Sequence, residues 1–221
     1  MADKEILIFV EGPSDKVFLE VYLYFLEDFP IKNFKVKDVK GKDNLSKRLL
    51  EIEKYDKTLI IFDANKDYES NKKEILTVVS KRKQTISEEQ IFLFPNNQDD
   101  GDLETLLLEI AKHDEFLKCF ESYLECIKSK EHHEPIKNIR KNMLYAYLEV
   151  FELQKFFQYK WDTNNKKQEK CLIDDKGKIK EKHKEEYEKL KEAIDFSSNS
   201  LISLKDFLGQ FAENKQKTNL F

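Results

Sequence analysis

The sequence predicts an α/β fold: a mostly parallel, four-stranded sheet flanked by helices and followed by a helical extension. Two observations predict it. Short apolar runs, rich in β-branched residues, end abruptly in acidic and turn residues, as buried parallel strands do. Between these runs, apolar residues recur at the spacing of helices that pack on a sheet. Strands that alternate with helices in this way form right-handed βαβ units.

The predicted strands all lie in the first half of the chain. They are expected at residues 5–10, 34–39, 58–62 and 90–94. The second run alternates between apolar and charged side chains, which is typical of a half-exposed strand. The other three runs are almost wholly apolar, which favours strands buried on both faces.

Helices are expected between and after these strands. The first helix begins at Ser14 and follows Pro13, which suits a helix N-terminus. Ser14 or Asp15 can cap this helix, and Pro30 stops it. The other helices of the first half are expected to follow the turn at residues 41–44, to occupy roughly residues 71–83, and to begin at residue 103.

Beyond about residue 110 the strand pattern ends and the chain is expected to be helical. Apolar residues recur at helical spacing over residues 116–127, 143–157 and 201–211, and residues 181–194 are expected to form a charged helix with few apolar residues. Residues 161–182 are polar and rich in Asn and Lys, so we expect a loop or a weak hairpin there. The chain therefore divides into an α/β domain, residues 1–110, and a helical extension, residues 111–221, packed on or beside it.

The composition limits the function classes. The net charge is −4, so the chain lacks the overall positive field of a protein that coats nucleic acid, although a local basic groove remains compatible with it. No apolar run approaches the length of a membrane span. The first residues lack the pattern of a signal peptide. We therefore expect a cytoplasmic protein that does not associate with a membrane.

Acidic residues follow the first predicted strand at the point where it ends. Glu11 comes directly after the strand, Gly12 lets the backbone turn sharply, and Asp15 lies four residues beyond Glu11. Ligands of α/β sheets bind at this edge, so both acids can face one site. Carboxylates gathered there repel one another unless a cation such as Mg²⁺ neutralises them. The alternative is that Asp15 caps the helix and Glu11 is solvated.

Three oxygen-bearing side chains follow the third predicted strand. Asp63, Asn65 and Asp67 alternate along the chain, and in an extended segment such residues share one face. Carboxylate and amide oxygens suit Mg²⁺ or Mn²⁺, so we expect these side chains to be metal ligands. The alternative is a polar turn after a strand.

Two further candidates belong to the same edge. Glu104 lies in the first turn of a predicted helix, either as a metal ligand or as an acid that interacts favourably with the helix dipole. Lys42 lies in the turn after the second strand, where its ammonium group can neutralise a phosphate oxygen; a solvated lysine is the alternative. Acids after the first, third and fourth strands, in that chain order, are more specific together than any one of them alone.

These segments resemble the motifs of Toprim domains, which occur in topoisomerases, bacterial primases, small ribosomal-RNA maturation nucleases and the overcoming-lysogenization-defect nucleases. Residues 10–15, Val-Glu-Gly-Pro-Ser-Asp, resemble the glutamate motif, and residues 63–65, Asp-Ala-Asn, resemble the Asp-x-Asp motif. Residues 41–45 and 94–104 are more similar to small stand-alone Toprim proteins related to the last group. The resemblance covers roughly residues 5–110.

The resemblance implies a Rossmann-type fold and a metal-dependent active site. It implies that Glu11 is a metal ligand or general acid/base, and that Asp63 is a metal ligand supported by Asp67. In the nuclease branch, the positions that match Asp15 and Glu104 complete a second metal site.

The chain departs from the family pattern at two positions. Asn65 stands where the family usually has its second Asp, and Tyr68 stands where it often has Gly. A neutral amide reduces the negative charge by one, so we expect weaker Mg²⁺ binding. Either Asp67 compensates for this loss, or the site is degenerate.

The sequence therefore predicts a Mg²⁺- or Mn²⁺-dependent phosphoryl-transfer enzyme, a nuclease acting on DNA or RNA, with Glu11, Asp63 and Lys42 as catalytic residues. Two cations about 3.5–4 Å apart would hold the scissile phosphate and activate water for in-line attack. The alternative is a catalytically degenerate Toprim module that binds nucleic acid or a partner protein through its helical half. The sequence makes no prediction of the oligomeric state.

Overall fold

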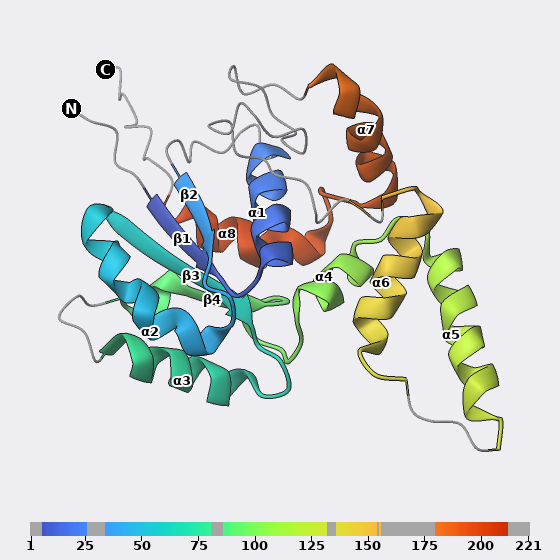
Figure 1. The fold of residues 1–221 in the computed structure, drawn as a ribbon, viewed down its shortest axis with the longest axis horizontal. Helices are drawn as coiled ribbons and strands as arrows, with labels where there is room; N and C mark the ends of the chain where they lie inside the picture. The colour runs from blue at the N-terminus through green and yellow to red at the C-terminus, as the bar shows by residue number, and fades with distance from the viewer. Residues whose placement is uncertain are drawn as a thin grey trace, which may run out of the picture.

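The computed structural model describes residues 6–25, 34–80, 86–131, 136–153, 155 and 180–211. Within these residues, four parallel strands form one sheet in the order β2-β1-β3-β4. The strands are β1 (Ile6–Val10), β2 (Phe34–Asp38), β3 (Lys57–Asp63) and β4 (Ile91–Phe94). The expected α/β fold with a parallel four-stranded sheet between helices is confirmed (Figure 1). Most of the expected loop or hairpin, residues 161–179, lies outside the described residues.

Both faces of the sheet are covered, because its strands carry apolar residues on both sides. β1 is buried along its whole length, as is β4. Side chains alternate between the faces, as the pleat of a strand requires. One face carries Ile6, Ile8, Val10, Leu59, Ile61, Phe92 and Phe94. The other carries Leu7, Phe9, Ile60, Phe62, Ile91 and Leu93.

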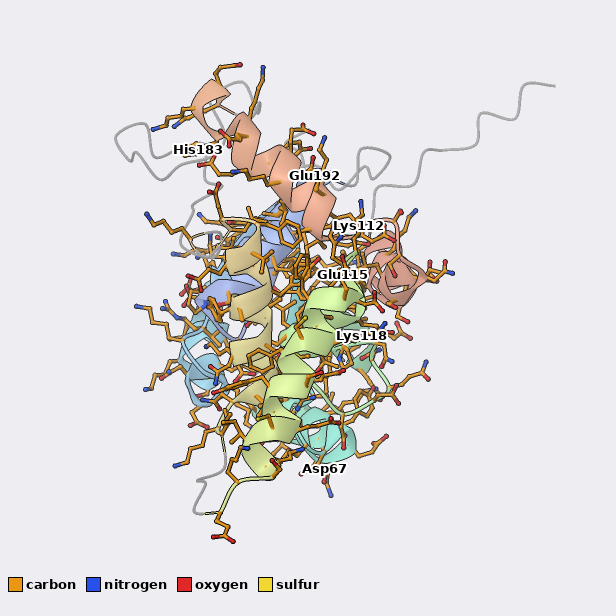
Figure 2. All side chains as sticks on the ribbon, turned by 90° about the vertical axis from the view of Figure 1, so that its right-hand side faces the viewer. Asp67, Lys112, Glu115, Lys118, His183 and Glu192 are labelled. Atoms are coloured by element: carbon orange, nitrogen blue, oxygen red, sulfur yellow. The ribbon has the colours of Figure 1, made fainter. Side chains whose placement is uncertain are left out.

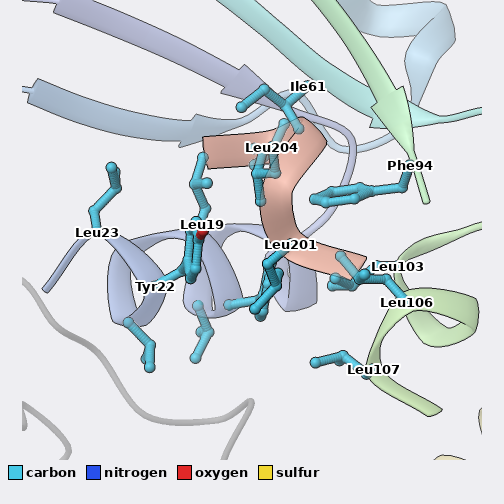
Figure 3. Close-up of a cluster of buried hydrophobic side chains, with 14 of the residues drawn as sticks. Leu19, Tyr22, Leu23, Ile61, Phe94, Leu103, Leu106, Leu107, Leu201 and Leu204 are labelled. Carbon is cyan, nitrogen blue, oxygen red and sulfur yellow. The ribbon is translucent and has the colours of Figure 1, made fainter. Parts of the chain in front are cut away.

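The first face packs against α1 (Pro13–Phe25), α4 (Leu103–Glu109) and α8 (Ile202–Gly209). Leucines of all three helices meet Ile61 and Phe94 of the sheet (Figure 3). The rings of Phe92 and Phe207 lie 5.3 Å apart, which joins α8 directly to β4. The helical extension therefore contributes α8 to the same hydrophobic core as the strands.

The opposite face packs against α2 (Leu45–Arg48) and α3 (Tyr68–Ser80), as Figure 1 shows. Short 3-10 turns, Lys42–Asn44 and Leu49–Lys54, flank α2. α3 begins at Tyr68, three residues before the predicted start, because Asp67 caps it: Asp67 Oδ1 accepts a hydrogen bond from the backbone N–H of Ser70 at 2.9 Å.

The remaining helices of the extension are α5 (Asp114–Lys128), α6 (Ile139–Val150) and α7 (Lys184–Ala193). α6 begins four residues before its predicted start, and Leu144 and Leu148 join the core around α4. α5 packs beside α6 and contains no fully buried residue. None of the helices that the structure describes has the length and apolar character needed to cross a membrane. The expected cytoplasmic location stays a prediction.

Candidate functional site

The carboxyl ends of β1 and β3 form the natural binding edge of this sheet. β2 lies on one side of β1 and β3 on the other, so the strand order reverses between β1 and β3. Parallel sheets bind ligands at the crevice outside such a switch point. Val10 pairs with Ile61, so Glu11, which follows β1, lies near Asp63, which ends β3. The sequence therefore folds with both predicted catalytic carboxylates at this edge of the sheet.

Backbone hydrogen bonds hold Glu11 between two strand ends. The backbone N–H of Asp63 donates to the Glu11 carboxylate. The backbone carbonyl of Glu11 accepts from the N–H of Gly41 at 2.9 Å. Gly41 has a positive φ of 94°, a conformation that glycine adopts without strain. This contact brings the turn that contains Lys42 to the same edge.

Asp15 lies beneath these residues in the first turn of α1. It is only 7% exposed, and its Oδ2 accepts a hydrogen bond from the backbone N–H of Gly12 at 2.7 Å. This bond satisfies an amide that precedes the helix, as a capping side chain does. Asp15 is therefore both a helix-end residue and a buried acid beside Glu11, so the two alternatives left open by the sequence are compatible.

Asp63 connects this edge of the sheet to α4. Its Oδ1 accepts a hydrogen bond from the backbone N–H of Leu103 at 3.0 Å. Glu104 is the next residue of α4 and is half-buried. Asp102 caps this helix by accepting from the backbone N–H of Thr105 at 2.8 Å, so the turn that carries Glu104 has a defined start.

The pKa values show that these four acids share one environment. Burial, followed by the charges of Asp15, Glu11 and Glu104, raises the pKa of Asp63 to about 9, against the lowering effect of the Leu103 amide. Burial, followed by the charges of Glu11 and Glu104, raises the pKa of Asp15 to about 7. Burial also raises the pKa of Glu11. We call Glu11, Asp15, Asp63 and Glu104 the carboxylate cluster.

The chemistry of the carboxylate cluster fits a hard divalent cation. Glu11 Oε2 is buried, and nothing in the described part of the chain donates a hydrogen bond to it. A buried carboxylate oxygen without a donor costs free energy, which a cation would recover. However, no group of three or more His, Cys, Asp or Glu side chains among the described residues is arranged so that it could hold a metal ion. The donors therefore suit Mg²⁺ by type, and binding one requires their side chains to move closer together.

Lys42 lies beside this cluster and is bound to α3. Its ammonium group donates to Asn71 Oδ1 at 2.6 Å and to Glu74 at 2.7 Å. Its positive charge lowers the pKa of Glu11, although less than burial raises it. The structure thus places Lys42 at the predicted edge, next to a predicted metal ligand.

Asn71 was not foreseen as part of this site. It is buried, and its amide group donates to the backbone carbonyls of Ala64 at 2.5 Å and Asp67 at 3.0 Å. Asn71, Ile75 and Val79 are the buried residues of α3. A polar residue at four-residue spacing on an otherwise apolar stripe is the signal that could have identified it.

The expected extended segment from Asp63 to Asp67 does not form, so that prediction is wrong. The strand ends at Asp63, and Asn65 adopts a left-handed backbone with φ of 58° while its N–H donates to Gly101 O at 2.5 Å. Asp67 lies exposed at the start of α3 (Figure 2). Neither side chain contributes to the pKa shifts of the carboxylate cluster. Their role as metal ligands stays a prediction.

Two basic residues of α6 reach this region, which the sequence analysis did not predict. The Arg140 guanidinium donates to Thr105 Oγ1 at 2.8 Å and lies 3.6 Å from Asp102 Oδ2. The charge of Lys141 lowers the pKa of Asp15, against burial and the neighbouring acids. Only the packing of α6 on α4 brings these residues near the sheet, and the spacing within one helix cannot predict that contact.

Comparison with known proteins gives a family and no function. Residues 5–212 match the model of one family, whose description is "Protein of unknown function (DUF3226)". No curated protein and no solved structure matches the chain significantly.

Proposed function

The chain belongs to the DUF3226 family, and we propose that it is a Mg²⁺-dependent phosphoryl-transfer enzyme, a Toprim-type nuclease that cleaves phosphodiester bonds of DNA or RNA. The observation that carries the proposal is the carboxylate cluster at the switch point of the sheet. Acids with raised pKa values in a crevice cost stability, and such clusters are typical of functional sites.

The four carboxylates are the residues that would hold the metal, with Mn²⁺ as an alternative to Mg²⁺. When bound, the metal supplies Lewis acidity and an activated water for attack on phosphorus. Glu11 is the best placed of the four, because its Oε2 has no hydrogen-bond donor among the described residues. Asp63 keeps its Oδ1 on the Leu103 amide and has its second oxygen to offer.

Lys42 is the proposed phosphate contact at this edge of the sheet. Its ammonium group is partly exposed and already lies beside Glu11. In the absence of substrate, Glu74 and Asn71 hold it in place. A phosphate oxygen would replace the exposed Glu74 as its partner, while the buried Asn71 keeps the side chain oriented.

The first test is metal binding, measured by Mn²⁺ electron paramagnetic resonance and by the thermal shift that Mg²⁺ produces. We expect the wild type to bind Mn²⁺ and Glu11→Gln to bind it at least about tenfold more weakly, because a carboxylate ligand is lost. Asp67→Asn is the matched control: it also replaces one acid by its amide, but outside the carboxylate cluster, and Asn caps a helix as well as Asp does.

Cleavage of labelled DNA and RNA by the same variants then tests the reaction. The proposal predicts metal-dependent cleavage by the wild type and by Asp67→Asn, and its loss in Glu11→Gln. If millimolar Mn²⁺ does not bind to the wild type, or if Glu11→Gln cleaves as fast as the wild type, the proposal is wrong.

A second candidate function is a degenerate Toprim module that binds nucleic acid or a partner protein without cleavage. The observation that favours it is that the described carboxylates are not arranged around a metal position. Asn65, in place of the second Asp of the Toprim pattern, points the same way. Oligonucleotide binding without any Mn²⁺ signal would support this candidate over the enzyme.

A further inference from the structure

We propose that Lys141, on α6 of the helical extension, contacts a phosphate group of the nucleic-acid substrate beside the carboxylate cluster. The inference rests on the proposed function and extends it. It adds a substrate contact from the part of the chain that lies outside the Toprim resemblance. It also makes α6 part of the active site instead of a separate layer.

α6 is attached to the helix that carries Glu104. Arg140 donates to Thr105 Oγ1 at 2.8 Å and lies 3.6 Å from Asp102 Oδ2, so it contacts both residues that cap α4. The same end of α4 donates the Leu103 N–H to Asp63. The first turn of α6 is thus held against the start of α4, next to the carboxylate cluster, by charge-assisted contacts.

Lys141 is the next residue along α6, and its charge is available. It is exposed, and within the residues that the structure describes it forms no ion pair with any carboxylate. Its ammonium group lies 5.9 Å from the centre of the ring of Tyr145, which is one helical turn further along α6. This cation–π contact favours a Lys141 side chain that lies along the helix. It is close enough to Asp15 to lower the pKa of that acid, which supports its place at the rim.

An acidic site needs such a cation to admit a phosphate. The carboxylate cluster repels a phosphodiester at long range, and the whole chain carries a net charge of −4. Lys42 follows Gly41, whose N–H donates to Glu11 O, whereas Lys141 follows Arg140, which contacts Thr105 and Asp102 at the start of α4. Two cations on different elements can each engage one of the successive phosphates of a strand, so the substrate class of this proposal is an oligonucleotide.

The test compares Lys141→Ala with Lys118→Ala as the matched control. Lys118 is an exposed lysine on α5, the outer helix of the extension (Figure 2). The probe is a fluorescein-labelled single-stranded oligonucleotide in Ca²⁺, with DNA and RNA versions, followed by fluorescence anisotropy over a range of salt concentrations. Mn²⁺ binding by electron paramagnetic resonance is measured on the same samples.

We expect Lys141→Ala to bind the oligonucleotide about fivefold more weakly, the effect of losing one exposed phosphate contact. The slope of log K against log salt should fall by about 0.7, the value for one phosphate of a single strand. Mn²⁺ binding should be unchanged or slightly tighter, because a positive charge near Asp15 has been removed. Lys141→Arg should restore oligonucleotide binding, and Lys118→Ala should resemble the wild type.

The inference is overturned if Lys141→Ala binds the oligonucleotide with the affinity and salt slope of the wild type. It is also overturned if the variant loses oligonucleotide and Mn²⁺ binding together, since that result indicates a structural role. A wild type that binds the oligonucleotide through Lys141 but does not bind Mn²⁺ would contradict the proposed function and leave this inference standing. A wild type that binds neither would overturn both.

Discussion

Two groups of acids lie after the strands of this sheet, and their surroundings differ. The loop acids, defined as Asp67, Asp99, Asp100 and Asp102, all have hydrogen-bond donors. Asp100 accepts from the Tyr68 N–H at 2.8 Å, and Asp99 accepts from the Asn96 side chain at 2.7 Å. The carboxylate cluster is more deeply buried: burial raises the pKa of Glu11, Asp15 and Asp63, and one oxygen of Glu11 has no donor among the described residues.

The comparison teaches that burial among other carboxylates, more than the acid itself, separates a structural carboxylate from a functional one. A carboxylate that accepts amide hydrogen bonds at a helix start stabilises the fold. A buried carboxylate without enough donors destabilises the fold and is retained for another reason. The following predictions test this distinction, from the largest expected effect to the smallest.

The largest effect is expected for Asp63→Asn in metal-free protein. The pKa of Asp63 is about 4 in the unfolded chain and is raised to about 9 in the folded protein. As the pH rises from about 4 to about 9, the unfolded state loses this proton while the folded state keeps it, so the free energy of unfolding falls. Asn keeps the acceptor for Leu103 without the charge. At pH 8.5 in EDTA, the free energy of unfolding should be about 1–3 kcal/mol larger for the variant than for the wild type. Urea denaturation measures this difference.

The pH dependence gives the internal control for this prediction. At pH 4.5, where the folded-state carboxyl of Asp63 is protonated, the advantage of Asp63→Asn should be small. Asp67→Asn should show no such growth in stability with pH, because Asp67 lies outside the cluster. If the two variants respond to pH in the same way, the distinction between the two groups of acids fails.

A smaller change in the free energy of unfolding is expected for substitutions of Asn65, because its backbone is left-handed. At φ of 58°, a residue with a Cβ is strained unless it is Asn or Asp, so Asn65→Ala should lose about 1–2 kcal/mol of unfolding free energy. Asn65→Gly should be close to the wild type, since glycine adopts this conformation freely. Chemical denaturation of both variants makes the comparison. A loss of Mn²⁺ binding in Asn65→Gly, without loss of stability, would instead identify Asn65 as a ligand.

The smallest effect is expected at Asp67. Asp67→Ala removes the acceptor for the Ser70 N–H at the start of α3 and should cost about 1 kcal/mol. Asp67→Ser retains a capping oxygen and should recover most of that loss. Both variants should bind Mn²⁺ as the wild type does. Thermal unfolding measures the stability of the wild type, Asp67→Ala and Asp67→Ser. Weaker Mn²⁺ binding by Asp67→Ser than by the wild type would identify Asp67 as a metal ligand.

The sequence predicted the sheet well because burial on both faces leaves a clear pattern. β1 and β4 are uninterrupted apolar runs, and acids mark where β1 and β3 end. The same logic predicted that Glu11, Asp15, Asp63, Asn65, Asp67 and Glu104 would converge, since parallel strands bring their carboxyl ends to one edge. The structure places Glu11, Asp15, Asp63 and Glu104 in one electrostatic environment, whereas Asn65 and Asp67 lie exposed.

The parts that the sequence did not predict depend on conformations and contacts outside any periodic pattern. Asn65 breaks the alternation after β3 with a single left-handed residue, which no strand pattern encodes. Asn71 reaches Lys42 across the space between α3 and the turn after β2. Arg140 and Lys141 reach the site only because α6 packs on α4, a contact between distant segments.

The position of α8 has a consequence for how the protein is made. This helix covers Phe92 on a sheet face whose strands lie in the first half of the chain, yet a ribosome synthesises it long after β4. Until α8 emerges, the nascent chain exposes an apolar sheet face and cannot complete its core. Sheet and helix are therefore expected to fold together, after most of the chain has been translated. A chaperone that shields this face would act on the growing chain, before the site at the sheet edge exists.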